Sequence, residues 1–449
     1  MSEIFKIHQK SKISKARTGT VTLAHGEIQT PVFMSIGTIG SVKGLDYQDL
    51  EKLNAEIILG NTYHLWLRPG LKVLEKAGGL HKFINWDRPI LTDSGGFQAF
   101  SLSKIRKFTD EGVFFKSQVD GQQRFLSPEI SMGIQTILGS DIALVLDEAL
   151  AAEVNFKEAK MAMYRTFAWA KRSKSEFERL QKEGVSVNQL IELEKTQSKV
   201  ALEKLAQIKK AKSDHFKKLA GKEIEIETKE LEISNSGDHL FETKLFSDNE
   251  KIENLKSEQN FMPPYPRYLF GIPQGAQFPE LRQESARLTM ELDFPGYSIG
   301  GVANGGEPEE IMYAQVLAQT EILEEEKPRH LLGVGTPRDI IEMVKRGIDM
   351  FDCVYPTRNA RHGSIFVWTD YEKLEYEVLK IQSSRFEMDF SPINKISKFS
   401  ELKSYKKAYL RHLFKAKELL ALRLATLNNL EFYYDLMIQI RRKINEGGL

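Results

Sequence analysis

The stretch GIDMFDCVYPTRNAR, residues 347–361, decides how the rest of the chain is interpreted. Its first half is an apolar run broken by one acid, Asp352, and predicts a short strand with a carboxylate near its end. Pro356 lacks the N–H that a sheet needs, so we expect the strand to stop there and Arg358 and Arg361 to follow in a loop. A carboxylate followed by two guanidinium groups suits a site that handles a phosphodiester. A structural ion pair would give the same pattern, and this stretch alone does not decide between the two.

The composition restricts the class of protein. The chain has 449 residues, 41% of them hydrophobic, which predicts roughly two to three domains, or one barrel with additions. The single cysteine, Cys353, excludes an intramolecular disulfide and a cysteine-rich metal site. We find neither an apolar run of about 18 residues nor an apolar leader, so we expect no membrane contact and a cytoplasmic protein. Because the formal net charge is +1, any nucleic acid must bind to a local patch.

Seven other apolar runs resemble the strand that ends at Asp352. Most are continuous rather than alternating, which is typical of strands buried on both faces of a parallel sheet. Turns and helix-like segments follow them, and eight such units predict an α/β fold, a (β/α)8 TIM barrel. The polar residues before the first run predict a small antiparallel lead-in. The seven runs cover residues 31–37, 55–60, 89–93, 141–147, 268–272, 297–300 and 330–334.

Polar residues stand at the ends of several runs. Asp93, Asp147 and Asp352 lie at the C-terminal ends of theirs, and Gln274 lies just past another. The active site of a TIM barrel is built at this end of the strands, so we expect the three carboxylates to converge there. Acids at strand ends also serve as structural caps, and we favour the functional interpretation over that one.

A long interruption separates the fourth strand from the fifth. It begins with helical periodicity, in which Met161, Tyr164, Ala168 and Trp169 are suited to pack on the barrel. The lysine- and glutamate-rich part that follows predicts a charged insert, mainly helical or partly disordered, with a strand-like piece near residues 223–228. The predicted divisions are 1–172 for the lead-in and first half of the barrel, 173–260 for the insert, 261–385 for the second half of the barrel, and 386–449 for a C-terminal helical subdomain.

Four motifs resemble those of the tRNA-guanine transglycosylase (queuine tRNA-ribosyltransferase) family. They follow in the family's order, and the resemblance covers the chain from about residue 10 onward, apart from the insert. In that family a (β/α)8 barrel exchanges the wobble guanine of certain tRNAs for a 7-deazaguanine. The motifs are LGNTYHL at residues 59–65, LTDSGGFQ at 91–98, GIPQG at 271–275 and DCVYPTRNAR at 352–361.

The resemblance implies a role for each candidate residue. Asp352 corresponds to the nucleophile that attacks C1′ of the ribose, and Asp93 corresponds to the general acid/base. Breaking an N-glycosidic bond with retention calls for such a pair of carboxylates, as in retaining glycosidases. The base must leave its stack to reach a barrel mouth, as in base-flipping enzymes. The other implied roles are reading of the base edge by Asp147, Gln274 and the Gly301 backbone, stacking by Phe97, and contact with the tRNA backbone by Arg358 and Arg361.

The first departure from the family pattern concerns its structural zinc, which three cysteines and a downstream histidine hold. Those positions fall at Ser397, Phe399, Leu402 and Asn428, which cannot make a tetrahedral zinc site, so we expect no metal and no other cofactor. We expect Phe399 and Leu402 to form an apolar plug instead. The zinc subdomain lies near the family's dimer interface, so a homodimer stays an open prediction.

The second departure lies in the base pocket. Family members that use the smaller aminomethyl precursor base, preQ1, usually read GGLAVGE where this chain has Gly300 to Glu307 with one extra residue, Asn304. Counted back from Glu307, Gly305 takes the place of the valine and would open the pocket toward the substituent at C7. The resemblance therefore favours queuine over preQ1, which stays the alternative.

Two other functions fit parts of the sequence. The first is a non-catalytic tRNA-binding subunit of a heteromeric transglycosylase, against which the intact Asp93, Asp147 and Asp352 argue. The second is an unrelated barrel enzyme that binds metal with its strand-end acids. The single cysteine and the lack of a histidine–carboxylate cluster along the sequence argue against it. We therefore expect an enzyme whose partners are a tRNA with a wobble guanine and a 7-deazaguanine base.

Overall fold

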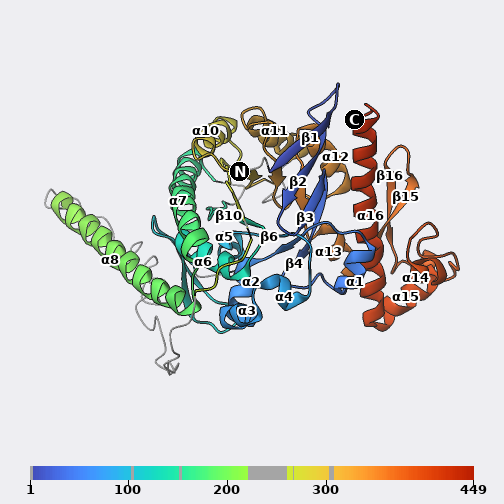
Figure 1. The fold of residues 1–449 in the computed structure, drawn as a ribbon, viewed down its shortest axis with the longest axis horizontal. Coiled ribbons are helices and arrows are strands. Elements are labelled where there is room, and N and C mark those ends of the chain that lie inside the picture. Colours follow the sequence, from blue (N-terminus) through green and yellow to red (C-terminus); the bar gives the residue numbers. More distant parts are fainter. Residues whose placement is uncertain (1–3, 103–105, 151–153, 221–259, 266, 303–307) are drawn as a thin grey trace.

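A computed structural model of the chain describes residues 4–102, 106–150, 154–220, 260–265, 267–302 and 308–449 (Figure 1). Its centre is an eight-stranded parallel sheet, and the predicted (β/α)8 fold is confirmed. Gly271 pairs in parallel with Tyr297, which joins the two edges of the sheet. The strand order is β11 (Tyr268–Phe270), β10 (Ile142–Leu144), β6 (Ile90–Thr92), β5 (Ile58–Gly60), β4 (Val32–Gly37), β14 (Met350–Asp352), β13 (Arg329–Leu331) and β12 (Tyr297–Ile299).

The register of the barrel places its polar residues. Met34 of β4 pairs with Asp352 of β14, so an early and a late part of the chain meet beside this acid. Ser298 of β12 lies opposite His330 of β13. Both residues are fully buried, as are most residues of the eight strands. The continuous apolar runs of the sequence reflect this burial on both sides.

Helices follow the strands and cover the barrel (Figure 1). Helix α12 (Pro337–Lys345) has a capped first turn, because the Thr336 hydroxyl accepts a hydrogen bond from the Asp339 N–H and Pro337 stands in that turn. The remaining helices around the barrel are α1 (Tyr47–Lys52), α2 (Thr62–Leu65), α3 (Leu71–Ala77), α4 (Leu80–Ile84), α5 (Gly96–Leu102), α6 (Pro128–Leu138), α10 (Pro279–Met290), α11 (Glu309–Thr320) and α13 (Tyr355–Arg361).

Helix α13 corrects the expectation that a loop follows Asp352. Arg358 and Arg361 lie on this helix, which begins at Tyr355. The strand β14 already ends at Asp352, and Pro356 stands in the first turn of the helix, where a missing N–H costs no hydrogen bond. Pro356 therefore belongs to the start of the helix, and it does not end the strand as the sequence predicts.

Within the described residues, three antiparallel sheets accompany the barrel. The expected lead-in consists of β1 (Phe5–Lys10), β2 (Arg17–Leu23) and β3 (Gly26–Thr30). A second sheet, β7 (Arg106–Phe108), β8 (Val113–Lys116) and β9 (Gln123–Leu126), lies between β6 and β10 in sequence. The hairpin β15 (Ser364–Asp370) and β16 (Glu375–Lys380) follows α13.

The interruption begins with two long helices, α7 (Phe156–Glu183) and α8 (Val187–Ala220). Of the four residues predicted to pack on the barrel, Trp169 is buried, whereas Met161, Tyr164 and Ala168 are exposed. The buried face of α7 also includes Ala162 and Met163. Helix α8 packs near its start, where Leu190 is buried, and extends away from the barrel in Figure 1. The predicted strand-like piece at 223–228 lies outside the described residues. Among the described helices, none is long and apolar enough to cross a membrane.

The C-terminal subdomain is largely helical, with α14 (Ser400–Ser404), α15 (Lys407–Ala416) and α16 (Leu419–Asn445). Helix α16 runs beside the barrel in Figure 1, and hydrogen bonds join the two. The Tyr433 hydroxyl donates to the Gly335 carbonyl at 2.6 Å, and Asn429 Nδ2 donates to the Pro356 carbonyl at 3.0 Å. Helix α16 thereby holds the start of α13, the helix that carries Arg358 and Arg361.

Candidate active site

A cavity of about 510 Å³ lies at the C-terminal ends of the barrel strands. Asp93, Asp147 and Asp352 all line it, as do Phe97 and Gly301. The first two acids lie just past β6 and β10, and Asp352 ends β14. The structure thus brings three carboxylates from distant parts of the chain into one cavity.

Asp93 is held by three N–H donors that the sequence did not point to. Asn61 Nδ2 and Gln98 Nε2 donate to its Oδ2 at 2.5 and 2.7 Å, and the Thr62 N–H donates to Oδ1 at 2.8 Å. Burial raises the pKa of Asp93 to about 6, and the charge of Asp352 acts in the same direction, while the hydrogen bonds oppose the shift. A carboxyl group with this pKa can hold or release a proton near neutral pH.

Asp147 and Gln274 form a bonded pair. Gln274 Nε2 donates to Asp147 Oδ2 at 2.7 Å, and the Ser94 hydroxyl donates to Oδ1 at 2.9 Å. Burial raises the pKa of Asp147, and these two hydrogen bonds lower it. Gly301 lies against the pair with φ of +64°, and a Cβ there would stand 2.3 Å from Gln274 Oε1. Only glycine allows the backbone so close to this amide.

Arg282 of α10 is a buried residue that the sequence did not single out. Its guanidinium donates to the carbonyls of Ala276, at 2.8 Å, and Gly300, at 2.6 Å, and also to that of Gly301. Arg282 thereby fixes the segments after β11 and β12, which carry Gln274 and Gly301. A buried arginine in a helix gives no sequence signal, because its carbonyl partners depend on the fold.

Asp352 also has a partner that the sequence did not single out, His330 of β13. Nε2 of His330 lies 2.9 Å from Asp352 Oδ1, and the Gly333 N–H donates to the same oxygen at 3.3 Å. The only sequence signal is a histidine at the start of an otherwise apolar run. The run predicts a strand, and one histidine in a strand does not indicate which side chain it contacts.

The two arginines of α13 have different surroundings. Arg358 is exposed and lines the cavity, whereas Arg361 faces a second hollow together with Lys43 and Arg423. The structure therefore places one of the two predicted tRNA-binding residues at the cavity and the other at a separate hollow, which Leu419, Leu420 and Leu422 also line. Gly305 lies outside the described residues.

The four positions that correspond to the family's zinc ligands hold two buried apolar side chains and two hydrogen-bonded polar ones. Phe399 and Leu402 are buried apolar side chains. The Ser397 hydroxyl donates to Glu431 Oε2 at 2.5 Å. Asn428 donates through Nδ2 to the Phe366 carbonyl at 2.9 Å and accepts through Oδ1 from Asn394. Two apolar side chains, a hydroxyl and an amide do not fit a zinc site, which takes thiolate, imidazole and carboxylate ligands.

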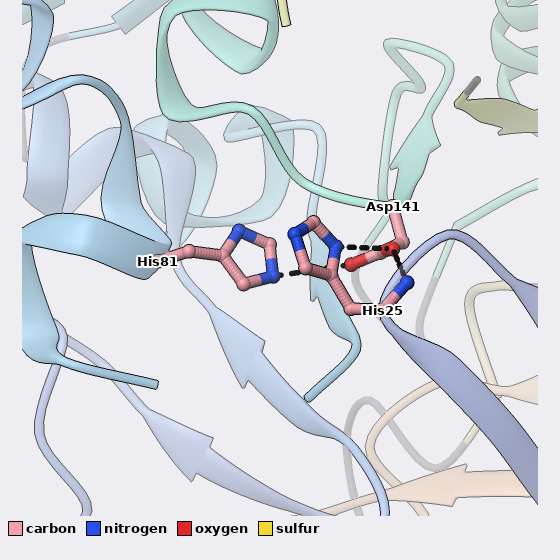
Figure 2. A group of neighbouring side chains, drawn as sticks. All are labelled: His25, His81 and Asp141. Carbon is pink, nitrogen blue, oxygen red and sulfur yellow. Dashed lines mark hydrogen bonds and ion pairs between the residues drawn. The ribbon is translucent and has the colours of Figure 1, made fainter. Parts of the chain in front are cut away.

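A histidine–carboxylate cluster lies elsewhere, at the N-terminal end of β10, contrary to the expectation that the chain lacks one. Figure 2 shows His25 and His81 beside Asp141, and their possible ligand atoms lie within 4.8 Å of one another. The two rings stack with centroids 3.8 Å apart and planes 18° from parallel. His25 Nδ1 lies 2.8 Å from Asp141 Oδ1, and the Ile90 N–H donates to Oδ2 at 2.9 Å.

We interpret this cluster as a structural tie. Although burial alone would raise the pKa of Asp141, hydrogen bonds from His25 and His81 hold it well below its usual range. Asp141 precedes β10, whereas the three active-site acids lie at the other ends of the strands. The N-terminal face of a TIM barrel serves stability rather than catalysis. The cluster joins the turn between β2 and β3 to the base of the barrel.

A barrel with carboxylates gathered at the C-terminal ends of its strands is typical of an enzyme, and comparison with known proteins gives its family. The family model described as "Queuine tRNA-ribosyltransferase" matches residues 11–211 and 248–449. The queuine tRNA-ribosyltransferase of Neisseria gonorrhoeae is 41% identical over 99% of this chain and 94% of its own length. Those of Desulforapulum autotrophicum and Caldanaerobacter subterraneus are each 40% identical, over 99% of this chain and 95% and 94% of theirs. The chain belongs to the queuine tRNA-ribosyltransferase family and is a pentosyltransferase enzyme.

Proposed function

We propose that this enzyme exchanges the wobble guanine of target tRNA anticodons for a 7-deazaguanine base through a covalent ribosyl-enzyme intermediate. The observation that carries the proposal is the meeting of Asp93, Asp147 and Asp352 in one cavity. One carboxylate can attack the sugar and a second can move the proton, as in retaining glycosidases. The third can read the base.

The chemistry needs two steps in opposite directions. In the first step, an oxygen of Asp352 forms a bond to C1′, the bond from C1′ to guanine N9 breaks, and protonated Asp93 gives its proton to the departing guanine. In the second, ionised Asp93 takes a proton from the incoming base while that base attacks C1′ and releases Asp352. A pKa of about 6 allows Asp93 to serve in both steps.

The base would be read at the Asp147–Gln274 pair. A carboxylate and an amide can pair with the N–H and carbonyl groups on a purine edge, and the Gly301 backbone lies beside them. Phe97 is 47% exposed, so its ring is accessible for stacking on the heterocycle. Queuine is the favoured base because of Gly305, and preQ1 is the alternative. Incorporation of the two bases measured in parallel tests this preference, and strict use of preQ1 would overturn it.

The tRNA would approach over α13. Arg358 is the proposed contact to the anticodon backbone at the cavity, and Arg361, beside Lys43 at the separate hollow, is the second proposed contact. A cytoplasmic location is part of the proposal, because the cytoplasm holds the tRNA substrate. A homodimer remains part of the proposal, and sedimentation of the purified enzyme over a range of concentrations tests it.

We propose further that the C-terminal subdomain is stable without zinc. Burial of Phe399 and Leu402, and the hydrogen bonds of Ser397 and Asn428, support this proposal. Purified enzyme should contain far less than one zinc per chain, and a chelator should leave its melting temperature unchanged. One tightly bound zinc per chain would overturn the proposal.

The exchange of labelled guanine into an anticodon with a wobble guanine tests the function. Wild type should exchange it, whereas Asp352→Ala and Asp352→Asn should bind the tRNA without exchange, because neither side chain can form the ester. Wild type alone should also leave a covalent RNA adduct on a denaturing gel. Wild-type enzyme that binds tRNA but never exchanges guanine would be behaving as a non-catalytic subunit, and would overturn the proposal.

A further inference from the structure

Three buried side chains on neighbouring strands form a line that ends at Asp352. The Ser298 hydroxyl of β12 lies 3.0 Å from His330 Nδ1, and His330 Nε2 lies 2.9 Å from Asp352 Oδ1. Ser298 and His330 are fully buried, and His330 does not line the cavity. His330 therefore touches the acid from the protein side and has no access to substrate.

The line fixes which nitrogen of His330 carries the proton. An ionised carboxylate has only acceptor sites, so a hydrogen bond from His330 to Asp352 requires a proton on Nε2. In the neutral ring Nδ1 is then an acceptor, and the Ser298 hydroxyl can donate to it. Ser298 thus favours the tautomer that donates to Asp352.

The two oxygens of Asp352 are consequently different. Oδ1 receives the Gly333 N–H in addition to His330, whereas no hydrogen bond from the described part of the chain reaches Oδ2. A carboxylate anchored through one oxygen keeps the other in a fixed direction. The anchored oxygen would become the ester carbonyl, and the free one would form the bond to C1′ as the bond to guanine N9 breaks.

We propose that His330 is a positioning residue for the nucleophile, that Ser298 orients His330, and that Oδ2 of Asp352 is the attacking oxygen. This inference rests on the proposed function, in which Asp352 attacks the ribose. Its consequence is that loss of the His330 donor lowers the rate of bond formation and leaves tRNA affinity unchanged. Misplacement of a reacting group by about 1 Å can cost about 100-fold in rate.

Two variants separate positioning from packing. His330→Gln keeps an N–H donor at a similar reach, whereas His330→Leu fills the space with an apolar group. Single-turnover formation of the covalent adduct should fall by about 10- to 100-fold in His330→Leu and by only a few-fold in His330→Gln. The KM for tRNA should match that of wild type in both. Ser298→Ala removes the hydroxyl that favours one tautomer of His330, so its rate of adduct formation should fall by less than that of His330→Leu. Ser298→Thr keeps a hydroxyl and should form the adduct at the wild-type rate.

Wild type and Asp352→Asn, measured alongside, distinguish failure of this inference from failure of the proposed function. If wild type forms no adduct or Asp352→Asn forms one, the proposed function fails. If those two behave as expected, wild-type rates in His330→Leu overturn the inference, as do equal losses in the Gln and Leu variants or an effect on KM alone. Should His330→Leu not fold, the other variants decide. Rescue by Ser298→Thr of a rate lost in Ser298→Ala supports the inference, and a wild-type rate in Ser298→Ala overturns it.

Discussion

Nε2 of Gln274 donates to Oδ2 of Asp147 at 2.7 Å, although the chain passes through the whole charged interruption between them. The two side chains come from neighbouring strands, because β10 and β11 pair in the barrel. Ser94, which lies just past β6 on the other side of β10, donates a hydrogen bond to the same carboxylate. The groups proposed to read the base are therefore held by the protein before any base binds, which would lower the ordering cost of recognition.

Replacing Asp147 by asparagine should weaken base binding. The new amide would place an N–H where a carboxylate oxygen now accepts, so a donor of the bound base would lose its acceptor at a cost of about 1–3 kcal/mol. We expect the KM for guanine, measured at saturating tRNA, to rise about 5- to 150-fold. Ser94→Ala, which removes one hydrogen bond and leaves the carboxylate, should have a smaller effect. An unchanged KM in Asp147→Asn would argue against its role.

The first chemical step should depend on pH through Asp93. The protonated form is the donor, and its pKa of about 6 means that its fraction falls about tenfold per pH unit above that value. Guanine release in a single turnover, without an incoming base, should therefore slow across pH 7–9. Asn61→Leu removes an N–H that favours the charged form, so it should raise the pKa and move the profile to higher pH. A rate independent of pH across this range would exclude Asp93 as the donor.

The cluster at the base of the barrel should affect stability and leave catalysis intact. Because the pKa of Asp141 is lowered by folding, its ionised form stabilises the native state above the unfolded value of about 4, and this contribution is lost as pH falls. Asp141→Asn should lower the free energy of unfolding at neutral pH by about 3 kcal/mol. The difference from wild type should shrink below pH 4. At a temperature where the variant is folded, kcat should match wild type, and a large loss of kcat would contradict the structural assignment.

Arg358 should contribute to tRNA binding through charge. Arg358→Ala should raise the KM for tRNA and reduce the salt dependence of binding by about one phosphate contact, while the KM for the base stays unchanged. Arg361→Ala removes the same charge three residues on and is the matched comparison. Because only Arg358 lines the cavity, its replacement should have the larger effect. Equal and negligible effects would place the tRNA elsewhere.

The barrel was predictable because its signal is local. Each buried strand is a continuous apolar run, and the acids at the ends of these runs mark the face where they meet. Pro356 was harder to interpret. The missing N–H that makes proline unsuitable inside a strand also makes it suitable for the first turn of a helix. On α7 the helical periodicity placed Met161, Tyr164 and Ala168 on the packing face, whereas the buried face includes Ala159 and Ala162.

The supporting residues of the site could not be predicted in this way. His330 sits in a strand and Arg282 in a helix, and each acts on a group from another element. Their partners are defined by strand order and loop conformation, which no short sequence pattern encodes. The cluster of His25, His81 and Asp141 was missed for the same reason, since its members come from three separate segments.

The pairing of β4 with β14 has a consequence for how the enzyme acquires activity. Asp352 reaches its place only when a strand from the end of the barrel pairs beside Met34, near its beginning. The entropic cost of closing so long a loop grows slowly with length, but contacts between distant segments form late in folding. A refolding chain should therefore regain its helical signal before it regains catalysis. The time course of recovered guanine exchange would then report when the barrel closes.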